Sequence, residues 1–280
     1  MAESLLSAWS LARKRLGDVK GLETPTFEAR LFVEAATGAT RMDILTDPYR
    51  EISYDAYAKL SEMLARREAR EPASHILGYK DFWTLRLGVS SAVLTPRPET
   101  ELVVKTALEM MKPDARILDL GTGSGAILLS LLSEKPESRG VGVDKSTEAL
   151  VFARANGVAL GLRDRVEWRE GEWGAGLDGP FDLIVSNPPY IKTATIGLLE
   201  PEVAEYEPHL ALDGGVDGLD AYRAILPQIH GLLAEDGIWA VEIGQGQAEA
   251  VWAYADKAGL RPLGVKEDLA GIPRVVFGRR

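Results

Sequence analysis

The chain has 280 residues, of which 46% are apolar, and this length suits two globular domains. Its formal net charge of −10 argues against direct nucleic-acid binding, which depends on cationic side chains that neutralise phosphates. The absence of cysteine excludes disulfides and thiolate chemistry, and the three histidines are too scattered to predict a metal site.

Residues 1–77 predict a small all-helical domain. Thr24 and Pro25 form a plausible helix start, and Gly38 is a typical stop signal. This part of the sequence shows no catalytic constellation, so we expect it to recognise a substrate partner. Its predicted helices cover residues 3–17, 25–37, 41–46 and 54–69.

The first predicted helix is amphipathic, with basic residues after its apolar ones, which is not the order found in a signal peptide. No apolar run in the chain approaches the roughly 20 residues of a membrane span. We therefore expect a cytoplasmic protein without membrane contacts. No dimer seam is apparent in the sequence, so a monomer is expected.

Residues 78–95 are rich in β-formers and predict a hairpin-like linker. Residues 96–280 form the expected second domain, which begins with a helix over 99–111. After this helix, strands and helices alternate, which is typical of a doubly wound parallel sheet. The predicted strands are 116–120, 139–143, 165–168, 181–186, 237–242 and 273–277, with helices at 125–134, 146–161, 219–233 and 246–258.

A glycine-rich loop follows the first strand of this domain and precedes a helix. It reads Gly121, Thr122, Gly123, Ser124, Gly125. Glycines let a ligand approach the backbone closely, and the helix start supplies unpaired N–H groups. The spacing lacks a P-loop lysine and the G-x-G-x-x-G pattern, which disfavours a nucleoside triphosphate and weakens the case for a nicotinamide dinucleotide.

An acidic residue, Asp144, ends the second strand about 20 residues after the glycines, where a carboxylate can accept hydrogen bonds from both ribose hydroxyls. Alternatively, Asp144 could cap the following helix. Trp173 follows the third strand and could pack against a flat purine, or it could belong to the core.

Asn187, Pro188, Pro189 and Tyr190 follow a buried strand, at the sheet edge where ligands bind in open α/β folds. Asn187 offers a carbonyl acceptor, the prolines stiffen the turn and remove N–H donors, and Tyr190 adds a flat face. These features suit a planar NH2-bearing group such as an amide or a base amine. A plain proline-rich loop after the strand is the competing interpretation.

The glycine loop, Asp144 and the Asn-Pro-Pro-Tyr motif together resemble those class I S-adenosylmethionine methyltransferases that act on amine or amide nitrogens, and the resemblance implies a Rossmann-like α/β fold. Within this class, the chain is similar to the peptide chain release factor glutamine methyltransferase family. The similar segments include Glu71-Pro72-Ala73-Ser74-His75-Ile76-Leu77-Gly78, Pro96-Arg97-Pro98-Glu99-Thr100-Glu101, Asp217-Gly218-Leu219-Asp220 and Glu242-Ile243-Gly244.

The resemblance implies that S-adenosylmethionine donates a methyl group to the glutamine of a Gly-Gly-Gln loop in a release factor, leaving S-adenosylhomocysteine. Asn187 and Tyr190 would be catalytic. The side-chain oxygen of Asn187 and the Pro188 carbonyl would accept the amide hydrogens, and Tyr190 would form a wall of the slot. The glycine loop, Asp144, Trp173 and Asn187 would bind the cofactor. Two alternatives stay open: an adenine-amine methyltransferase acting on DNA or RNA, and a non-catalytic binding module.

Overall fold

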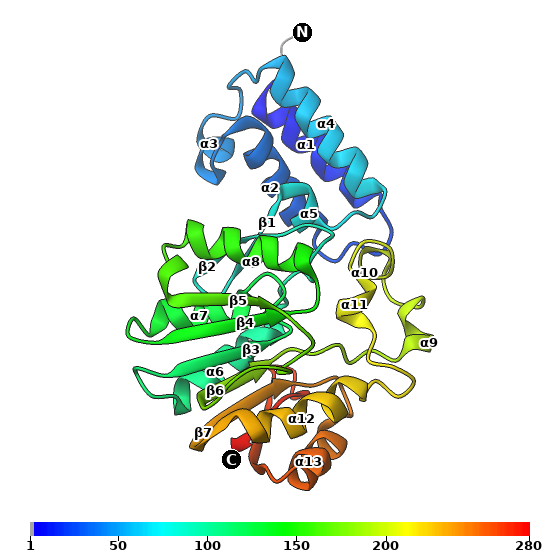
Figure 1. Cartoon of the computed structure of the whole chain (residues 1–280). Coiled ribbons are helices and arrows are strands. Elements are labelled where there is room, and N and C mark those ends of the chain that lie inside the picture. The colour runs from blue at the N-terminus through cyan, green and yellow to red at the C-terminus, as the bar shows by residue number, and fades with distance from the viewer. Residues whose placement is uncertain (1–2) are drawn as a thin grey trace. The chain divides into compact units, whose positions relative to one another are not determined.

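The computed structural model describes residues 3–280, and the chain divides into two compact units (Figure 1). One unit contains the residues up to Gly78 together with residues 200–206. The other contains residues 79–199 and 207–280. The chain therefore passes from one unit to the other three times. Each unit has a hydrophobic core of its own.

The first unit is helical. Its helices start where the sequence supplies caps: Ser4 caps the first helix in a capping box, and Gly38 ends the second in the left-handed conformation. Thr24 occupies the expected cap position of the second helix, although its side chain makes no capping hydrogen bond. The helices are α1 Leu5–Gly17, α2 Pro25–Thr37, α3 Arg41–Thr46, α4 Tyr54–Glu68, α5 Ala73–Leu77 and α10 Pro201–Ala204.

Residues 200–206 pack with this helical unit although they come from the middle of the expected second domain. The guanidinium group of Arg67, which is only 4% exposed, contacts Glu28 at 2.6 Å and Glu202 at 2.7 Å. Arg70 forms a second ion pair with Glu202, and the Tyr206 hydroxyl donates to the backbone oxygen of Ala69 at 2.7 Å. The second unit is therefore interrupted by residues 200–206, whereas the sequence predicts one continuous domain over residues 96–280.

The second unit is built on a seven-stranded sheet with the strand order β5-β4-β3-β6-β7-β9-β8. Strands β3 to β7 are parallel, whereas β9 runs antiparallel to both β7 and β8, so the sheet is mixed and not wholly parallel. The strands are β3 Arg116–Leu120, β4 Arg139–Asp144, β5 Val166–Glu170, β6 Phe181–Ser186, β7 Leu233–Glu242, β8 Arg261–Glu267 and β9 Pro273–Arg279. A separate hairpin precedes this sheet, with strands β1 Tyr79–Phe82 and β2 Leu85–Gly88.

Helices cover both faces of this sheet, as expected for a doubly wound fold (Figure 1). Helices α6 and α7 contribute to the apolar core on one face, and α12 and α13 contribute to the core on the other. The helices of this unit are α6 Glu101–Met110, α7 Ala126–Glu134, α8 Thr147–Ala159, α9 Thr193–Ile196, α11 His209–Leu212, α12 Asp220–Leu232 and α13 Ala248–Lys257, with 3-10 turns at Pro98–Thr100 and Arg163–Arg165.

Candidate active site

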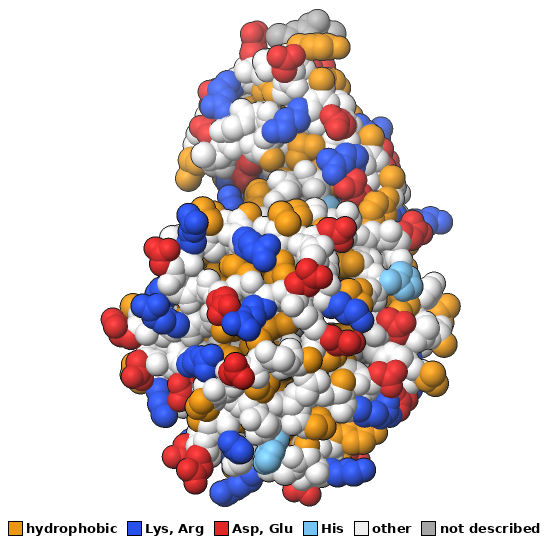
Figure 2. All heavy atoms as spheres, viewed as in Figure 1, with side chains coloured by type: hydrophobic (Ala, Val, Ile, Leu, Met, Phe, Trp, Pro, Cys, Tyr) orange, Lys and Arg blue, Asp and Glu red, His pale blue; other side chains and the backbone are white. Residues whose placement is uncertain are grey.

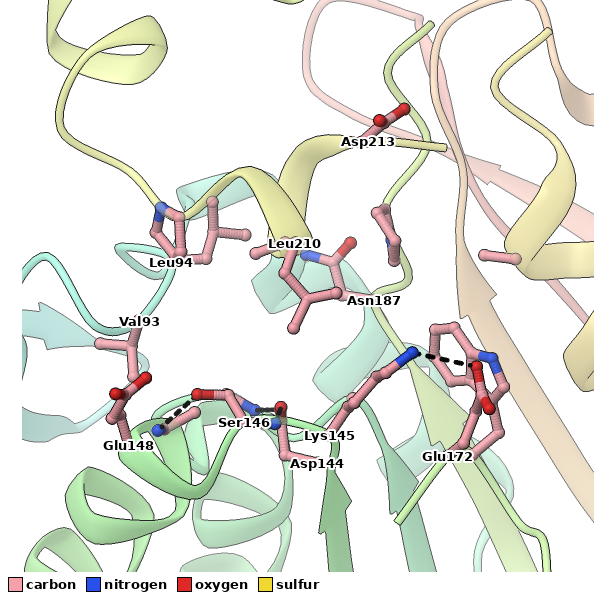
Figure 3. Close-up of a pocket in the computed structure, with 18 of the residues that line it drawn as sticks. Val93, Leu94, Asp144, Lys145, Ser146, Glu148, Glu172, Asn187, Leu210 and Asp213 are labelled. Atoms are coloured by element: carbon pink, nitrogen blue, oxygen red, sulfur yellow. Dashed lines mark hydrogen bonds and ion pairs between the residues drawn. The ribbon is translucent and has the colours of Figure 1, made fainter. Parts of the chain in front are cut away.

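A cavity of about 530 Å³ opens beyond the carboxyl ends of β3, β4 and β6. In Figure 3, Asn187 and Leu210 lie on one side of this pocket, and Asp144 and Ser146 lie on the other. All of the lining residues belong to the second unit. Of the residues predicted for the site, the pocket is lined by Gly121, Gly123, Asp144, Trp173, Asn187 and Pro189.

The glycine loop adopts a backbone that favours glycine. Gly121 and Gly123 have φ angles of 71° and 55°, and a Cβ on Gly121 would come within 3.3 Å of the Trp173 ring. Thr122 and Ser124 are buried and do not line the cavity. Gly125 has a φ of 83° and caps the start of α7. The loop thus presents glycine backbone, and not side chains, to the pocket.

Asp144 lies at the end of β4 and is tied to the backbone through both carboxylate oxygens. Oδ2 accepts a hydrogen bond of 2.8 Å from the Gly123 N–H, and Oδ1 accepts one of 2.9 Å from the Ser146 N–H. Burial raises the pKa of Asp144, and these backbone hydrogen bonds oppose that rise. Ser146 caps α8, so Asp144 does not act as the helix cap. Each carboxylate oxygen retains a lone pair for a ligand.

Trp173 lines the pocket and also packs against the apolar core beneath it. Its φ of 57° is unusual for a non-glycine residue. Neighbouring Glu172 forms a 3.3 Å ion pair with Lys145, which Figure 3 shows beside the cavity. The core interpretation therefore describes part of the indole, and contact of its cavity-facing part with a purine stays a prediction.

The apolar part of the pocket wall lies partly in a segment for which the sequence predicts only a linker, residues 78–95. Val93 and Leu94 of this segment line the cavity. Leu210 and Ala221 contribute from more distant parts of the chain. The apolar pair within the otherwise polar and proline-rich run 90–98 was the available signal.

The loop that carries Leu210 is anchored by a buried carboxylate. The side chain of Glu207 is 1% exposed and forms a 2.7 Å ion pair with Arg97. Burial raises the pKa of Glu207, and the positive charge of Arg97 opposes the rise. This pair fixes the segment before Pro208 to the Pro-Arg-Pro segment, two parts of the chain 110 residues apart.

The Asn-Pro-Pro-Tyr motif directly follows β6, and its residues lie partly at the pocket and partly in the interior. Asn187 and Pro189 line the cavity, whereas Pro188 is buried. The Asn187 side-chain nitrogen donates to the Thr100 hydroxyl at 3.1 Å, which leaves the side-chain oxygen available as an acceptor. The Tyr190 hydroxyl donates to Oε1 of Glu242 at 3.3 Å, so this side chain is directed toward the interior and does not line the cavity.

Glycines shape the backbone around this motif. A Cβ on Gly214 would lie 2.8 Å from the Pro189 carbonyl oxygen, and one on Gly218 would lie 2.5 Å from the Tyr190 carbonyl oxygen. Gln247 completes the support, because its side-chain nitrogen donates to the Tyr190 carbonyl at 3.0 Å. The rigidity of the two prolines is therefore reinforced by contacts from a loop and from the start of α13.

Two buried carboxyl groups lie beneath the site, and sequence reasoning assigned neither of them to it. Burial raises the pKa of both Asp119 and Glu242 to about 7. The Thr122 hydroxyl donates to Asp119 at 2.7 Å, which supports the glycine loop from below. An ionisable residue within or directly after an apolar run of a strand is the signal that could have identified both.

Outside the pocket, charges of both signs are interspersed. On the face shown in Figure 2, Lys and Arg side chains alternate with Asp and Glu and form no continuous basic tract. Within residues 3–280, no cluster of three or more potential ligands could hold a metal ion. No helix in the same range is both long enough and apolar enough to cross a bilayer.

Family models match both parts of the chain. The model of the PrmC N-terminal domain matches residues 7–78, and that of the methyltransferase small domain matches residues 98–214. Together with the observed sheet and helices, these matches confirm the predicted fold class. A solved structure of the T. thermophilus 16S rRNA N2 G1207 methyltransferase superposes with a TM-score of 0.50 at 19% identity, covering 72% of this chain and 49% of that one. At this identity the likeness concerns the fold alone.

Curated relatives align over almost the whole length. The release factor glutamine methyltransferase of Caulobacter vibrioides is 48% identical, over 99% of this chain and 97% of that protein. Proteins of the same name from Rhodospirillum rubrum and Bradyrhizobium diazoefficiens are each 46% identical, covering 94% and 99% of this chain and 81% and 95% of their own lengths.

Proposed function

Because the chain belongs to the release factor glutamine methyltransferase family, we propose that it methylates the side-chain amide nitrogen of the glutamine in the Gly-Gly-Gln loop of a peptide chain release factor. One observation in the site carries this proposal: Asn187 lies in the same cavity as the glycine loop and Asp144, with its side-chain nitrogen already bound to Thr100. An acceptor for an amide hydrogen therefore lies within the pocket that would hold the methyl donor.

The residues that line the pocket fit S-adenosylmethionine. The free lone pairs of Asp144 would accept hydrogen bonds from the ribose hydroxyls. Because Gly121 and Gly123 carry no side chains, the cofactor could lie close to their backbone. Trp173 would pack against the adenine, and Asn187 would also contact the cofactor. When bound, S-adenosylmethionine supplies a methyl group on a positively charged sulfur, and S-adenosylhomocysteine remains after the transfer.

The protein would act mainly by positioning the acceptor amide. The Asn187 side-chain oxygen and the Pro188 carbonyl would each accept one amide hydrogen and so fix the plane of the group. Tyr190 does not line the cavity and its hydroxyl is held by Glu242, so it would fix the backbone of the motif beside the amide. Alignment of reacting groups is worth several kcal/mol of barrier, which suits a weakly nucleophilic amide nitrogen. That nitrogen loses one proton on methylation, and solvent accepts it.

The helical unit would contribute to recognition of the release factor. It supplies none of the residues that line the pocket, yet the model of the PrmC N-terminal domain matches residues 7–78. Recognition of a folded protein requires surface beyond a pocket that admits a single side chain. The release factor is therefore the proposed partner, with the helical unit as one of its contact regions.

The proposal is tested by incubation with methyl-labelled S-adenosylmethionine and one of three acceptors. These are an intact release factor, the same factor with its Gly-Gly-Gln glutamine replaced by asparagine, and an oligonucleotide rich in adenine. Label is expected in the intact factor alone, and mass spectrometry should place it on the glutamine. Label in the oligonucleotide, or equal label in both release factors, would contradict the proposal.

A further inference from the structure

Glu242 lies beside Asn187 because of the strand register. Ser186 at the end of β6 is paired with Val241 of β7, so the next residue on each strand falls at the same level of the sheet. Asn187 lines the pocket, whereas Glu242 is 1% exposed and does not line it. Glu242 therefore touches neither of the proposed ligands and can affect the reaction only through other residues.

Two routes lead from Glu242 to the Asn-Pro-Pro-Tyr motif. The direct route is the 3.3 Å hydrogen bond that Oε1 accepts from the Tyr190 hydroxyl. The second route passes through Thr100, which is 3% exposed and whose hydroxyl lies near enough to the Glu242 carboxyl group to lower its pKa. The same hydroxyl oxygen accepts the 3.1 Å bond from the Asn187 side-chain nitrogen.

The direction of these bonds determines which way the Asn187 amide faces. The Thr100 hydroxyl has one proton, and when that proton is donated to the carboxylate its oxygen can only accept. Asn187 must then turn its NH2 group toward Thr100, which leaves its carbonyl oxygen for the substrate. Without this constraint, the two ends of a side-chain amide are nearly equal in shape and can exchange places.

We propose that Glu242 is a positioning residue that fixes the Asn187 amide through Thr100 and the Tyr190 ring directly. This inference rests on the proposed function, because it concerns how the acceptor amide is held. A buried carboxyl group is costly unless its lone pairs are satisfied. Among residues 3–280, Oε2 of Glu242 has no hydrogen bond of regular geometry, so packing alone does not account for an acid at this position.

The kinetic test compares substitutions within the route with matched substitutions outside it. Glu242→Gln and Thr100→Val keep the side-chain shapes but remove the carboxylate and the hydroxyl. Glu235→Gln changes an exposed acid on the same strand, and Thr106→Val removes a buried hydroxyl that donates to the Leu102 backbone oxygen. Thr100→Ser restores the hydroxyl.

With saturating cofactor, Glu242→Gln and Thr100→Val should lower kcat for methylation of the release factor at least about tenfold, since misplacement of a reacting group commonly costs this much or more. The cofactor Kd should stay within twofold of wild type. Thr100→Ser should recover most of the rate, and the control variants Glu235→Gln and Thr106→Val should match wild type. Equal losses in Thr106→Val, or no loss in Glu242→Gln and Thr100→Val, would overturn the assignment.

A second measurement requires no methyl acceptor. The side-chain NH2 resonances of Asn187, identified by their loss in Asn187→Asp, should shift with pH near neutrality as Glu242 titrates. This shift should disappear in Glu242→Gln and in Thr100→Val and persist in Glu235→Gln. Resonances that have the same position in wild type, Glu242→Gln and Thr100→Val at every pH would overturn the assignment. If instead the signal behaves as expected and no release factor is methylated, the proposed function fails while the orientation of Asn187 stands.

Discussion

The backbone N–H of Gly123 donates a 2.8 Å hydrogen bond to Oδ2 of Asp144, joining the glycine loop after β3 to the end of β4. Two residues 21 positions apart thereby form one structural unit. The loop cannot shift without disturbing the carboxylate, and the carboxylate cannot rotate without releasing the loop. Binding to either part of the pocket therefore depends on the other.

Replacement of Asp144 by alanine should weaken S-adenosylmethionine binding by roughly 1.5–3 kcal/mol, the usual worth of hydrogen bonds to a charged group. Loss of the Gly123 contact adds to this effect. Calorimetric titration of the cofactor gives the Kd directly, and Asp164→Asn, which changes an exposed acid elsewhere, should retain the wild-type value. An unchanged Kd in Asp144→Ala would refute the ribose assignment.

Asn187→Ala should reduce kcat by about 100-fold or more, because the amide would lose an acceptor that aligns it for attack. Cofactor affinity should change little, since Asp144 and the glycine loop stay in place. Single-turnover methylation of the release factor, measured together with the cofactor Kd, separates the two effects. Near-normal turnover in this variant would exclude Asn187 from the proposed role.

Gly218→Ala should impair catalysis although residue 218 lies outside the pocket wall. The φ of 80° costs a non-glycine residue about 1–2 kcal/mol, and the new Cβ would lie 2.5 Å from the Tyr190 carbonyl oxygen. We expect a lower melting temperature and a loss in kcat of about tenfold, because the motif backbone must move.

The matched control for this variant is Gly197→Ala. Gly197 ends α9 with a φ of −69°, and a Cβ there would meet no atom within 4 Å. It should leave both the melting temperature and kcat near wild type. If the two variants behave alike, the close approach of Gly218 to the motif has no functional importance.

The pH dependence of stability should report on Asp119. Burial raises its pKa from 3.8 to about 7, opposed by the bonds from Thr122 and the Leu128 backbone and assisted by the negative charge of Asp144. The folded protein therefore holds this proton more tightly than the unfolded chain. Its contribution to stability is fully present below about pH 4 and is lost as the pH rises through 7.

The measurement is urea unfolding at pH 5 and pH 8. Between pH 5 and pH 8, the titration of Asp119 should lower the free energy of unfolding of the wild type by a value on the order of 3 kcal/mol, since each pKa unit corresponds to about 1.4 kcal/mol. The Asp119→Asn variant should lack this decrease. The exposed Asp164→Asn variant should retain the wild-type slope. Identical slopes in wild type and Asp119→Asn would show that the carboxyl group does not titrate in this range.

The sequence predicted most clearly the two strands that are almost fully buried. The strands expected over 116–120 and 181–186 match β3 and β6, because their apolar runs lie in the sheet interior. Strand β8 was missed because it lies at the sheet edge, is nowhere fully buried and contains Pro262 and Gly264. The antiparallel direction of β9 depends on sheet order, which no local pattern encodes.

The sequence predicted the parts of the site that local motifs specify, and it did not predict the contacts between distant residues. Motif spacing placed Asn187, Asp144 and the glycine loop at one edge of the sheet, and the structure brings them together in one cavity. The bond between Asn187 and Thr100 joins residues 87 positions apart, and that between Tyr190 and Glu242 joins residues 52 positions apart. The first pair depends on how the turn before α6 packs against the end of β6, and the second depends on the register of β6 against β7. A sequence motif carries no information about either.

The return of residues 200–206 to the helical unit affects how this protein can be divided. A fragment that begins at Tyr79 still carries Glu202 and Tyr206, whose partners Arg67, Arg70 and Ala69 have been removed. A chimera that exchanges the helical unit between relatives must therefore exchange these residues with it. The chain crosses between the two units at three points. The last two lie within the loop that leads from the Asn-Pro-Pro-Tyr motif back to the pocket.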